Sequence, residues 1–428
     1  MTAILAFSLS YGGILWYADS IKSLNDLKMT LYPHPSLEMY LHLRDYRPYA
    51  PASIHGDTYR LGVFRFFARY TRGDMSLSLG DEPLTFGRGL SLFLADDEKA
   101  LLEGTLRGLH LSRSWMRLYG GLKRRWIYYS SDNDTMLLAG ATLTPSLGDV
   151  SLGLNVGAYN LYGRDGASGM IAGSYASGKF GPVSIYAEGA LRDGYDLFTY
   201  GRNLGYALYG NLEISRGSIV LGTELKDYYR IGQEFNLPAP GNGYGLLPSD
   251  GRDEWGANLY FSYGTLNLEL ARAYSHDMDH LMDYYALSYY TDWRRFTPKI
   301  GAHLLDWSEN LNERRAFLEI KYNAPLGIIA YAEYRTRYLK GVGDWESQPY
   351  ASLSLIYGGI TLSLSYRRYM ITGKTDRVAE FSYDNFRFLR LFVSWGEFSG
   401  DIVCSSGVCR YEPPFSGLKL GLNLYFVL

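Results

Sequence analysis

The chain has 428 residues, including 40 Tyr, 19 Phe, 8 Trp and 48 Gly, and its formal net charge is −2. The near-neutral charge and the lack of a long basic run argue against nucleic acid as a partner. A membrane-spanning helix needs about 20 consecutive apolar residues, and no stretch of the sequence reaches that length. A transmembrane β-barrel stays open as a fold class, because each of its strands needs only about 9–11 residues.

The first residues, MTAILAFSLSYGGILWYADS, allow two interpretations. Residues 1–18 are either the remnant of an export signal or the first strand, and we favour the strand because no Lys or Arg precedes the apolar stretch.

Apolar and polar residues alternate with a period of two along most of the chain, as at 39–44, 151–158, 266–271 and 360–367. This pattern predicts strands with one apolar face. The alternation slips near Val63–Phe64, which predicts a β-bulge there.

Short and long connections also alternate along the sequence. Tight turns such as TRGD at 71–74 and SRGS at 215–218 are followed by longer polar segments such as SSDNDT at 130–135. Transmembrane barrels show this asymmetry, with short periplasmic turns and longer extracellular loops. We therefore predict an all-β fold, a single transmembrane antiparallel β-barrel over residues 1–428 without a separate plug domain. The expected strand number is 24, within a range of 20–26, and both termini should lie at the periplasmic rim.

The second face of the strands carries charges at many positions, which favours a wet lumen over a packed soluble core. Soluble propellers and β-solenoids are the alternative, but they show sequence repeats at a fixed period, and we find none. The residues predicted to line the lumen are His42, Arg44, Arg65, Arg69, Arg88, Glu224, Lys226, Glu269, Glu319, Lys321, Arg367 and Lys419.

The segment Gly80–Leu94 reads GDEPLTFGRGLSLFL and departs from simple alternation. It resembles a motif of uncharacterised bacterial outer-membrane β-barrel proteins, G-[ND]-x-x-x-x-F-G-R-G-L, with Glu82 and Pro83 replacing the usual aromatic pair. The matching residues are Gly80, Asp81, Phe86, Gly87, Arg88, Gly89 and Leu90. Four further segments also resemble that family. They are Asp96–Asp97–Glu98, Leu106–Arg107–Gly108, FNLPAP at 235–240 and LPSDGRDEWG at 247–256. The resemblance implies a barrel in the outer membrane, and it brings no catalytic residue.

Two segments are candidates for narrowing the lumen. They are Gly80–Leu94, interrupted by glycines and Pro83, and the long connection Ile231–Glu254, rich in Gly, Pro and Asn. Irregular segments of this composition do not continue a strand.

The last segment, Ser416–Leu428, alternates cleanly and should close the barrel. Its partner should be the strand near 8–17, or Ser36–Tyr49 if the N-terminus is a trimmed signal. Lys419 and Asn423 should face the lumen, whereas the apolar face should contact lipid, namely Leu418, Leu420, Leu422, Leu424 and Phe426.

Cys404 and Cys409 precede this strand in CSSGVC, which we place in an extracellular loop. In an oxidising compartment they could form a disulfide, and two free thiols are the alternative.

His276, Asp277, Asp279 and His280 are of metal-ligand type, but we favour a solvated polar loop. We predict no metal and no cofactor.

Several aromatic residues near strand ends suit the membrane interface, with stacking against sugars in the lumen as the alternative. They are Tyr289, Tyr290, Trp293, Trp307, Tyr369 and Trp395.

The leading functional hypothesis is a porin-like outer-membrane channel for passive passage of small polar solutes. The alternative is a structural or assembly barrel that anchors partner proteins. An outer-membrane hydrolase ranks third, because no GxSxG sequence is present, and we expect no enzyme. Expected partners are outer-membrane lipid and lipopolysaccharide, the barrel-assembly machinery and small solutes, but not nucleic acid. The sequence does not predict the solute or the oligomeric state.

Overall fold

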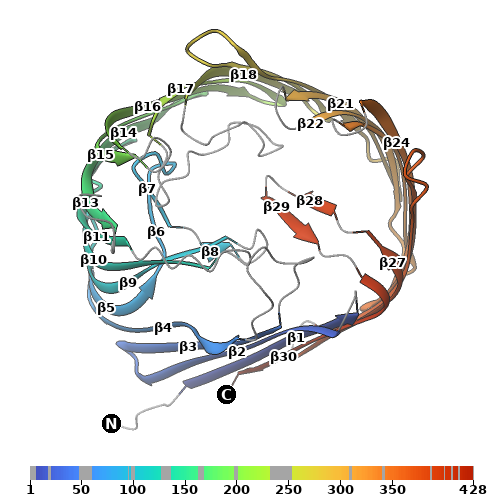
Figure 1. Cartoon of the computed structure of the whole chain (residues 1–428), viewed down its shortest axis with the longest axis horizontal. Helices are drawn as coiled ribbons and strands as arrows, with labels where there is room; N and C mark the ends of the chain where they lie inside the picture. The colour runs from blue at the N-terminus through green and yellow to red at the C-terminus, as the bar shows by residue number, and fades with distance from the viewer. Residues whose placement is uncertain are drawn as a thin grey trace.

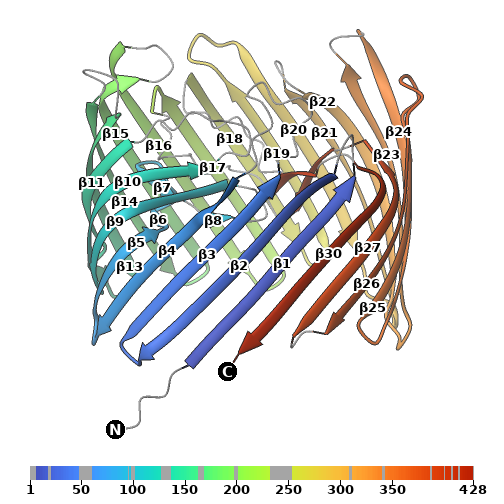
Figure 2. The ribbon, with the colours of Figure 1, turned by 60° about the horizontal axis from the view of Figure 1, so that its bottom comes forward.

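The computed structural model describes residues 6–17, 21–47, 60–94, 96–97, 102–126, 136–161, 168–196, 201–231, 253–307, 311–339, 343–385, 388–399, 401–405, 408–412 and 415–427. These residues form a closed antiparallel barrel of 24 strands, as the sequence predicts (Figures 1 and 2). No helix in this part of the chain is long and apolar enough to cross a membrane.

The strands of the first half are β1 Ala6–Tyr17, β2 Ile21–His34, β3 Leu37–Arg47, β4 Arg60–Arg72, β5 Met75–Glu82, β6 Leu84–Phe86, β7 Leu92–Leu94, β8 Asp96–Asp97, β9 Leu102–Arg113, β10 Met116–Trp126, β11 Met136–Leu143, β12 Ser146–Leu147, β13 Val150–Leu161, β14 Ser168–Phe180, β15 Val183–Asp196 and β16 Gly201–Arg216. The strands of the second half are β17 Ile219–Tyr229, β18 Asp253–Tyr263, β19 Leu266–Tyr274, β20 His280–Tyr290, β21 Phe296–Trp307, β22 Leu311–Tyr322, β23 Gly327–Leu339, β24 Asp344–Tyr357, β25 Ile360–Arg368, β26 Thr375–Asn385, β27 Leu389–Phe398, β28 Asp401–Ser405, β29 Val408–Glu412 and β30 Phe415–Val427.

The first and last strands close the barrel. β1 pairs with β30 from Ser8↔Val427 to Trp16↔Lys419, so the segment near 8–17 is a wall strand and the predicted closure is confirmed. The predicted bulge is confirmed too, because the β3–β4 register steps from His42↔Arg65 to Leu43↔Val63 and leaves Phe64 unpaired. A bulge of this kind admits one extra residue on one strand.

The start of β1 and the end of β30 lie at the same rim, here called the rim of the termini, which follows from an even number of wall strands (Figure 2). The connections at that rim are tight. Gly73, Gly181 and Gly217 occupy three of these turns with φ near +60°, a conformation that glycine adopts without strain. The connections at the opposite rim are mostly longer, as the alternation in the sequence predicts.

The wall is apolar outside and charged inside. Leu79 and Ile300 are examples of the outward row and are 60% and 57% exposed to solvent in the isolated chain. His42 and Glu313 are examples of the inward row and are only 2% and 1% exposed. A soluble protein has the opposite arrangement, whereas a barrel in lipid requires this one.

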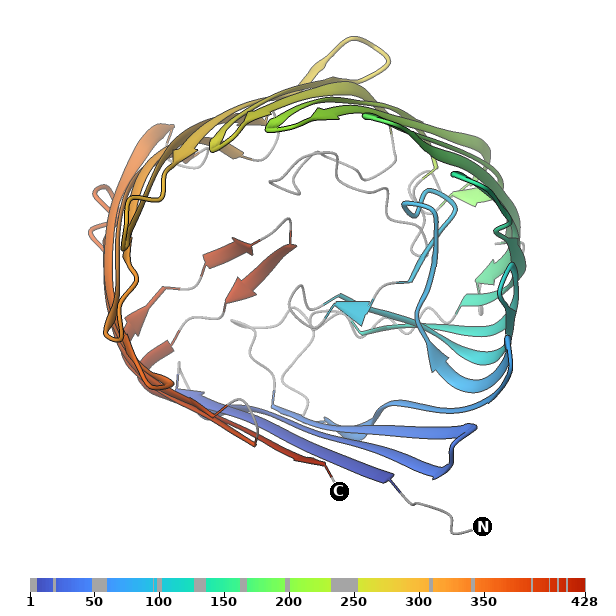
Figure 3. The ribbon, with the colours of Figure 1, turned by 180° about the vertical axis from the view of Figure 1, so that it is seen from behind.

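Two hairpins lie inside the ring, as views from both ends show (Figures 1 and 3). One is β6–β7, within the predicted segment Gly80–Leu94. The other is β28–β29, where Cys404 is the register partner of Cys409. These cysteines lie in the connection between β27 and β30 at the rim opposite the termini, as expected, but the hairpin that contains them folds inward, which the sequence did not predict. Their side chains lie outside the described part, so the disulfide stays a prediction. Residues 232–252, the core of the second predicted occluding segment, also lie outside it.

Candidate functional site

The candidate site is the inner wall together with the hairpin at residues 84–94, which we call the constriction hairpin. Its origin is at Gly80, where β5 turns away from β4 with φ +125°. A Cβ at Gly80 would lie 2.3 Å from the carbonyl oxygen of Phe66, so only glycine fits there. Pro83 follows and cannot donate a ladder hydrogen bond. The strand therefore leaves the wall at this point and enters the lumen.

An apolar cluster holds the constriction hairpin against one side of the wall. The leucines and Phe86 of the hairpin are at most 2% exposed. The residues that they pack against lie on β9 to β17 and at Ile231. The hairpin contributes Leu84, Phe86, Leu90, Leu92 and Leu94, and the wall contributes Leu106, Tyr119, Met136, Leu138, Tyr159, Ile171, Ala190, Ala207, Tyr209 and Tyr228. In this sector apolar and aromatic residues occupy many positions of the inner face and give the hairpin a surface on which to pack.

A buried carboxylate binds the tip of the hairpin. Glu188 on β15 is 3% exposed, and its two oxygens accept the backbone N–H groups of Arg88 at 2.6 Å and Leu90 at 3.1 Å. The hydroxyl of Tyr186 donates to the same carboxylate at 2.5 Å. Hydrogen bonds to an ionised acceptor are about twice as strong as neutral ones. Glu188 therefore fixes the position of the tip.

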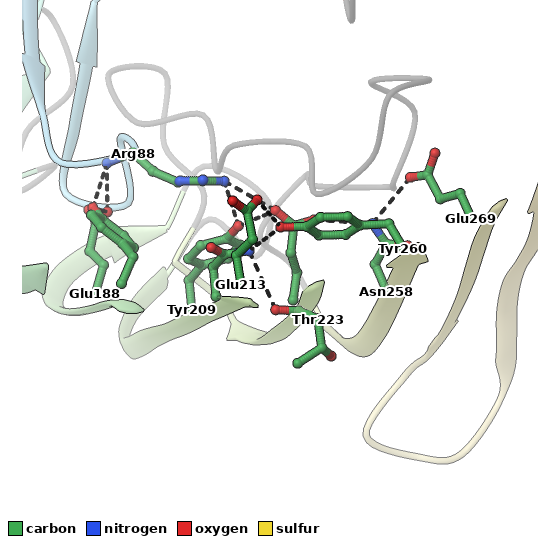
Figure 4. Close-up of polar contacts among 11 residues, drawn as sticks. Arg88, Glu188, Tyr209, Glu213, Thr223, Asn258, Tyr260 and Glu269 are labelled. Carbon is green, nitrogen blue, oxygen red and sulfur yellow. Dashed lines mark hydrogen bonds and ion pairs between the residues drawn. The ribbon is translucent and has the colours of Figure 1, made fainter. Parts of the chain in front are cut away.

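The Arg88 side chain extends from the tip along the wall (Figure 4). Its Nη1 donates to the Tyr209 hydroxyl at 2.5 Å and lies 3.3 Å from Oε1 of Glu224. Asn258 donates to Glu224 at 3.2 Å and also to Glu269 at 3.2 Å. Three of the residues predicted to line the lumen, Arg88, Glu224 and Glu269, thus belong to one hydrogen-bonded network. Tyr209 and Asn258 complete it, and their uncharged side chains gave no sequence signal of this role.

Lys226, also predicted, forms an ion pair with Glu254 at 3.1 Å, and both side chains are almost fully buried. We did not predict Glu254, which lies at the start of β18 after the long connection.

The inner wall formed by β21 to β25 is different, and we call it the charged sector. Glu313 accepts from His303 at 2.9 Å and from Arg337 at 2.6 Å. Glu333 pairs with Arg315 at 2.6 Å and with Arg335 at 2.9 Å. None of these residues was in the predicted set, although all of them lie on the inward parity of their strands. The parity of neighbouring apolar residues was the signal that could have identified them.

The remaining predicted residues are distributed around the ring rather than gathered. His42 and Arg44 both contact Asp26 on β2, at 2.7 and 2.6 Å. Arg69 pairs with Glu82 at 2.7 Å, and Arg65 donates to the carbonyl oxygen of Asp81 at 3.2 Å.

The last four predicted residues lie on the second half of the wall, and one of them, Lys419, is near the closure. Lys321 and Glu319 form a pair at 3.1 Å. Arg367 lies 5.0 Å from the centre of the Tyr350 ring, and Lys419 lies 5.5 Å from that of Phe415.

The four metal-type residues do not converge. His276 binds two other carboxylates, Asp253 through Nδ1 and Asp227 through Nε2 at 2.9 Å, whereas His280 faces Asp283 at 3.4 Å. The part of the chain that the structure describes holds no cluster of three or more groups suited to a metal ion. Partial burial disfavours the charged imidazole, but the hydrogen bonds that the imidazole makes to the carboxylates of Asp253 and Asp227 outweigh this effect and raise the pKa of His276 above its usual value. The loop is thus held by ion pairs.

The predicted interface aromatics are mostly exposed. Trp293 and Trp395 are 66% and 68% exposed in the isolated chain, and Tyr289 and Tyr290 are exposed as well. Tyr369 differs, because its hydroxyl donates to Asp376 at 2.9 Å. The side chain of Trp307 lies outside the described part. Assignment of this set to a membrane interface stays a prediction.

Comparison with known proteins supports the fold. No protein-family model and no curated protein matches the chain. Among solved structures, the chain is similar to a chain of the E. coli P pilus tip assembly intermediate PapC-PapD-PapK-PapG. The TM-score is 0.54 at 10% identity, covering 99% of this chain and 60% of that one. The P pilus usher (PapC) translocation pore is also similar, with a TM-score of 0.49 at 10% identity. The match covers 99% of this chain and 100% of that one. For the structure of Pseudomonas aeruginosa OpdK with vanillate, the TM-score is 0.41 at 13% identity, and the match covers 99% of each chain. The first of these likenesses, with a TM-score above 0.5, supports the β-barrel fold.

Proposed function

We propose that this protein is a porin-like channel of a bacterial outer membrane that lets small polar solutes pass passively. The observation behind the proposal is the one-sided attachment of the constriction hairpin. Its apolar contacts are with β9 to β17 and Ile231, whereas the charged sector presents ion pairs on the inner wall of β22 and β23. A hairpin fixed to one side narrows a lumen, and the charged inner wall suits water and polar solutes.

The outer face supports the proposed location. Its rows of exposed leucine, isoleucine and aromatic residues match a wall in contact with lipid. In this proposal lipopolysaccharide and the barrel-assembly machinery are further partners, and transport rather than catalysis is the role of the barrel.

Single-channel recording in planar bilayers tests the function. We would compare the intact protein with a variant in which residues 84–94 are replaced by a short Gly-Ser linker. We expect discrete conductance steps from the intact protein and larger steps from the variant, because conductance rises with the cross-section of the pore. Shortening the connection at residues 275–279, which is not part of the hairpin, is the matched control and should leave the step size unchanged.

If neither the intact protein nor the linker variant conducts, although heat-modifiable migration in detergent shows that both are folded, the channel proposal is wrong. The alternative of an anchoring barrel would then lead.

A further inference from the structure

The wall is incompletely paired where β5 leaves it. β4 pairs with β3 along nearly its whole length, from Leu37↔Tyr70 to Tyr46↔Arg60. Its ladder with β5 ends at Phe67↔Gly80. Within the described residues, the stretch Arg60–Phe66 is therefore paired with β3 alone. On the other side, β9 pairs with β5 as far as Glu82↔Leu106 and with β8 at Asp96↔Glu103 and Asp97↔Leu102. We call the boundary between the stretch Arg60–Phe66 and this part of β9 the β4–β9 seam.

Asp81 joins the two strands across this seam. One oxygen of its carboxylate accepts the backbone N–H of Phe66 on β4 at 3.0 Å. Arg107 on β9 donates to both oxygens, with Nε at 2.9 Å and Nη2 at 2.6 Å. The Arg107 guanidinium also lies 4.6 Å from the centre of the Phe66 ring. A side chain thus substitutes at this point for the strand pairing that ended at Gly80.

This ion pair is on the lipid side of the wall. Asp81 and Arg107 are register partners, and they share the parity of Leu79 and Leu109, which are 60% and 55% exposed. On β10, Arg107 is the partner of Leu122, which is also exposed. The pair therefore borders the exposed apolar residues of the outer surface.

A charge within the membrane-spanning part of a protein is costly, and it marks a functional site by default. Asp81 is fully buried, whereas the Arg107 side chain is 29% exposed. A continuous strand with apolar side chains would close the wall at no such cost. Instead, Arg107 holds the Asp81 carboxylate, which accepts from Phe66 across strands that no ladder joins, and this contact can be broken without unpairing a β-ladder.

The side of the seam that faces the lumen is apolar. Leu106, the residue before Arg107, is fully buried in the cluster that holds the constriction hairpin, together with Leu84 and Leu94. An acyl chain that crossed the seam would move from lipid directly to this cluster. Arg65 and Arg107, which both bind Asp81, would meet an anionic or polar head group.

We propose that the β4–β9 seam is a lateral opening through which an amphiphile of the outer leaflet, an acyl chain with a polar head group, reaches the lumen, and that Asp81 with Arg107 holds it closed. The proposal goes beyond solute conduction. It depends on the proposed membrane location and not on the channel activity, so a protein that does not conduct can still pass or fail its test.

The test uses the full chain in liposomes that contain a phosphatidylcholine with a photoactivatable diazirine in its acyl chain. Crosslinked peptides are identified by mass spectrometry. In the intact protein we expect crosslinks to outward residues such as Leu79 and Leu109. In Asp81→Asn and Arg107→Gln we expect a several-fold rise of crosslinks to Leu84, Leu94 and Leu106. Asp74→Asn is the matched control, because it breaks another Asp–Arg pair, with Arg113 of β9 at 2.8 Å, at the rim of the termini.

If crosslinks in folded Asp81→Asn and Arg107→Gln stay on the outward residues, the seam is no opening and the proposal is overturned. An equal rise of lumenal crosslinks in Asp74→Asn would also overturn it, because general loosening of the barrel would then explain the result. Should both primary variants fail to fold, Arg107→Lys keeps the charge and loses the two-point contact, and the same two outcomes apply to it.

Discussion

The inner wall has two contrasting sectors. The hairpin sector is the wall from β9 to β17, on which the constriction hairpin packs. Its contact partners are far apart in the chain, since the contacts of Glu188 with Arg88 and Leu90 join residues separated by 100 and 98 positions. In the charged sector the partners lie on neighbouring strands, as for Glu313 with His303 and Arg337. The first sector is built to bind a specific segment. The second satisfies its own charges and needs no cover.

The difference shows how one barrel can hold a fixed constriction and a wet wall together. Apolar side chains in a lumen are stable only when something packs on them, whereas paired charges are stable beside water. Changes in the hairpin sector should therefore displace the hairpin, and changes in the charged sector should alter the electric field in the lumen.

The largest effect is expected for Phe86→Ala. Phe86 is 2% exposed in the apolar cluster, and truncating such a side chain costs about 3 kcal/mol or more. The docking of the hairpin should weaken, which hydrogen–deuterium exchange of residues 84–94 would detect as faster exchange. Phe180→Ala is the matched control, because Phe180 is 55% exposed. Unchanged exchange in Phe86→Ala would contradict the role of the cluster.

Glu188→Gln should have the next largest effect. The amide keeps the shape of the side chain but replaces the ionised acceptor of two backbone N–H groups, at a cost of about 2 kcal/mol. We expect faster exchange confined to the tip and larger or noisier conductance steps. Glu213→Gln is a control in the same region, where the carboxylate binds Tyr260 and not the tip. Equal behaviour of the two variants would count against Glu188 as the anchor.

Gly87→Ala isolates the fit of the tip. Gly87 and Gly181 have nearly the same φ, +56° and +59°, so an alanine at either position costs about 1 kcal/mol of backbone strain. Only at Gly87 would the new Cβ collide, at 2.6 Å from the Glu188 carboxylate and the Tyr186 hydroxyl. Thermal unfolding should show a larger loss for Gly87→Ala than for Gly181→Ala. Equal losses would mean that the tip is not tightly held.

Glu313→Gln tests the charged sector. It removes a negative charge beside His303, Arg335 and Arg337 and should shift the channel toward anions with little effect on the hairpin. The reversal potential in a salt gradient measures this shift. A variant that keeps the ion selectivity of the intact protein would show that this sector does not contribute to the field.

The smallest effect is a pH dependence at residues 275–279. Because the pKa of His276 is raised in the folded chain, its ion pairs stabilise the loop fully below the unfolded pKa and are lost as pH rises through the folded pKa. Hydrogen–deuterium exchange of these residues, corrected for intrinsic rates, should therefore be slower at about pH 5.5 than at about pH 8.5. The corresponding difference in loop stability should be less than about 1 kcal/mol. His276→Gln should remove the difference.

The sequence predicted much of the wall because strand alternation is local. The parity of Leu418 to Phe426, the slip near Val63 and the alternation of short and long connections are each visible within a few residues, and together they led to the strand number and the closure. The acceptor of the hairpin tip was not predictable in this way. Nothing near Glu188 distinguishes it from other inward glutamates, and its role depends on a segment about 100 residues away. The inward direction of β28–β29 was likewise not predictable from the alternation of its own residues.

The pairing of β1 with β30 has a consequence for the order of folding. Every other neighbour in the wall follows closely in sequence, so those ladders form by local steps along the chain. Closure instead joins Ser8 to Val427, and loop-closure entropy makes contacts of such separation slow to form. Any open sheet formed before closure would have β1 and β30 as its two edges. Exposed edges of this kind invite pairing with other chains, which makes protection of these two strands the critical requirement during biogenesis.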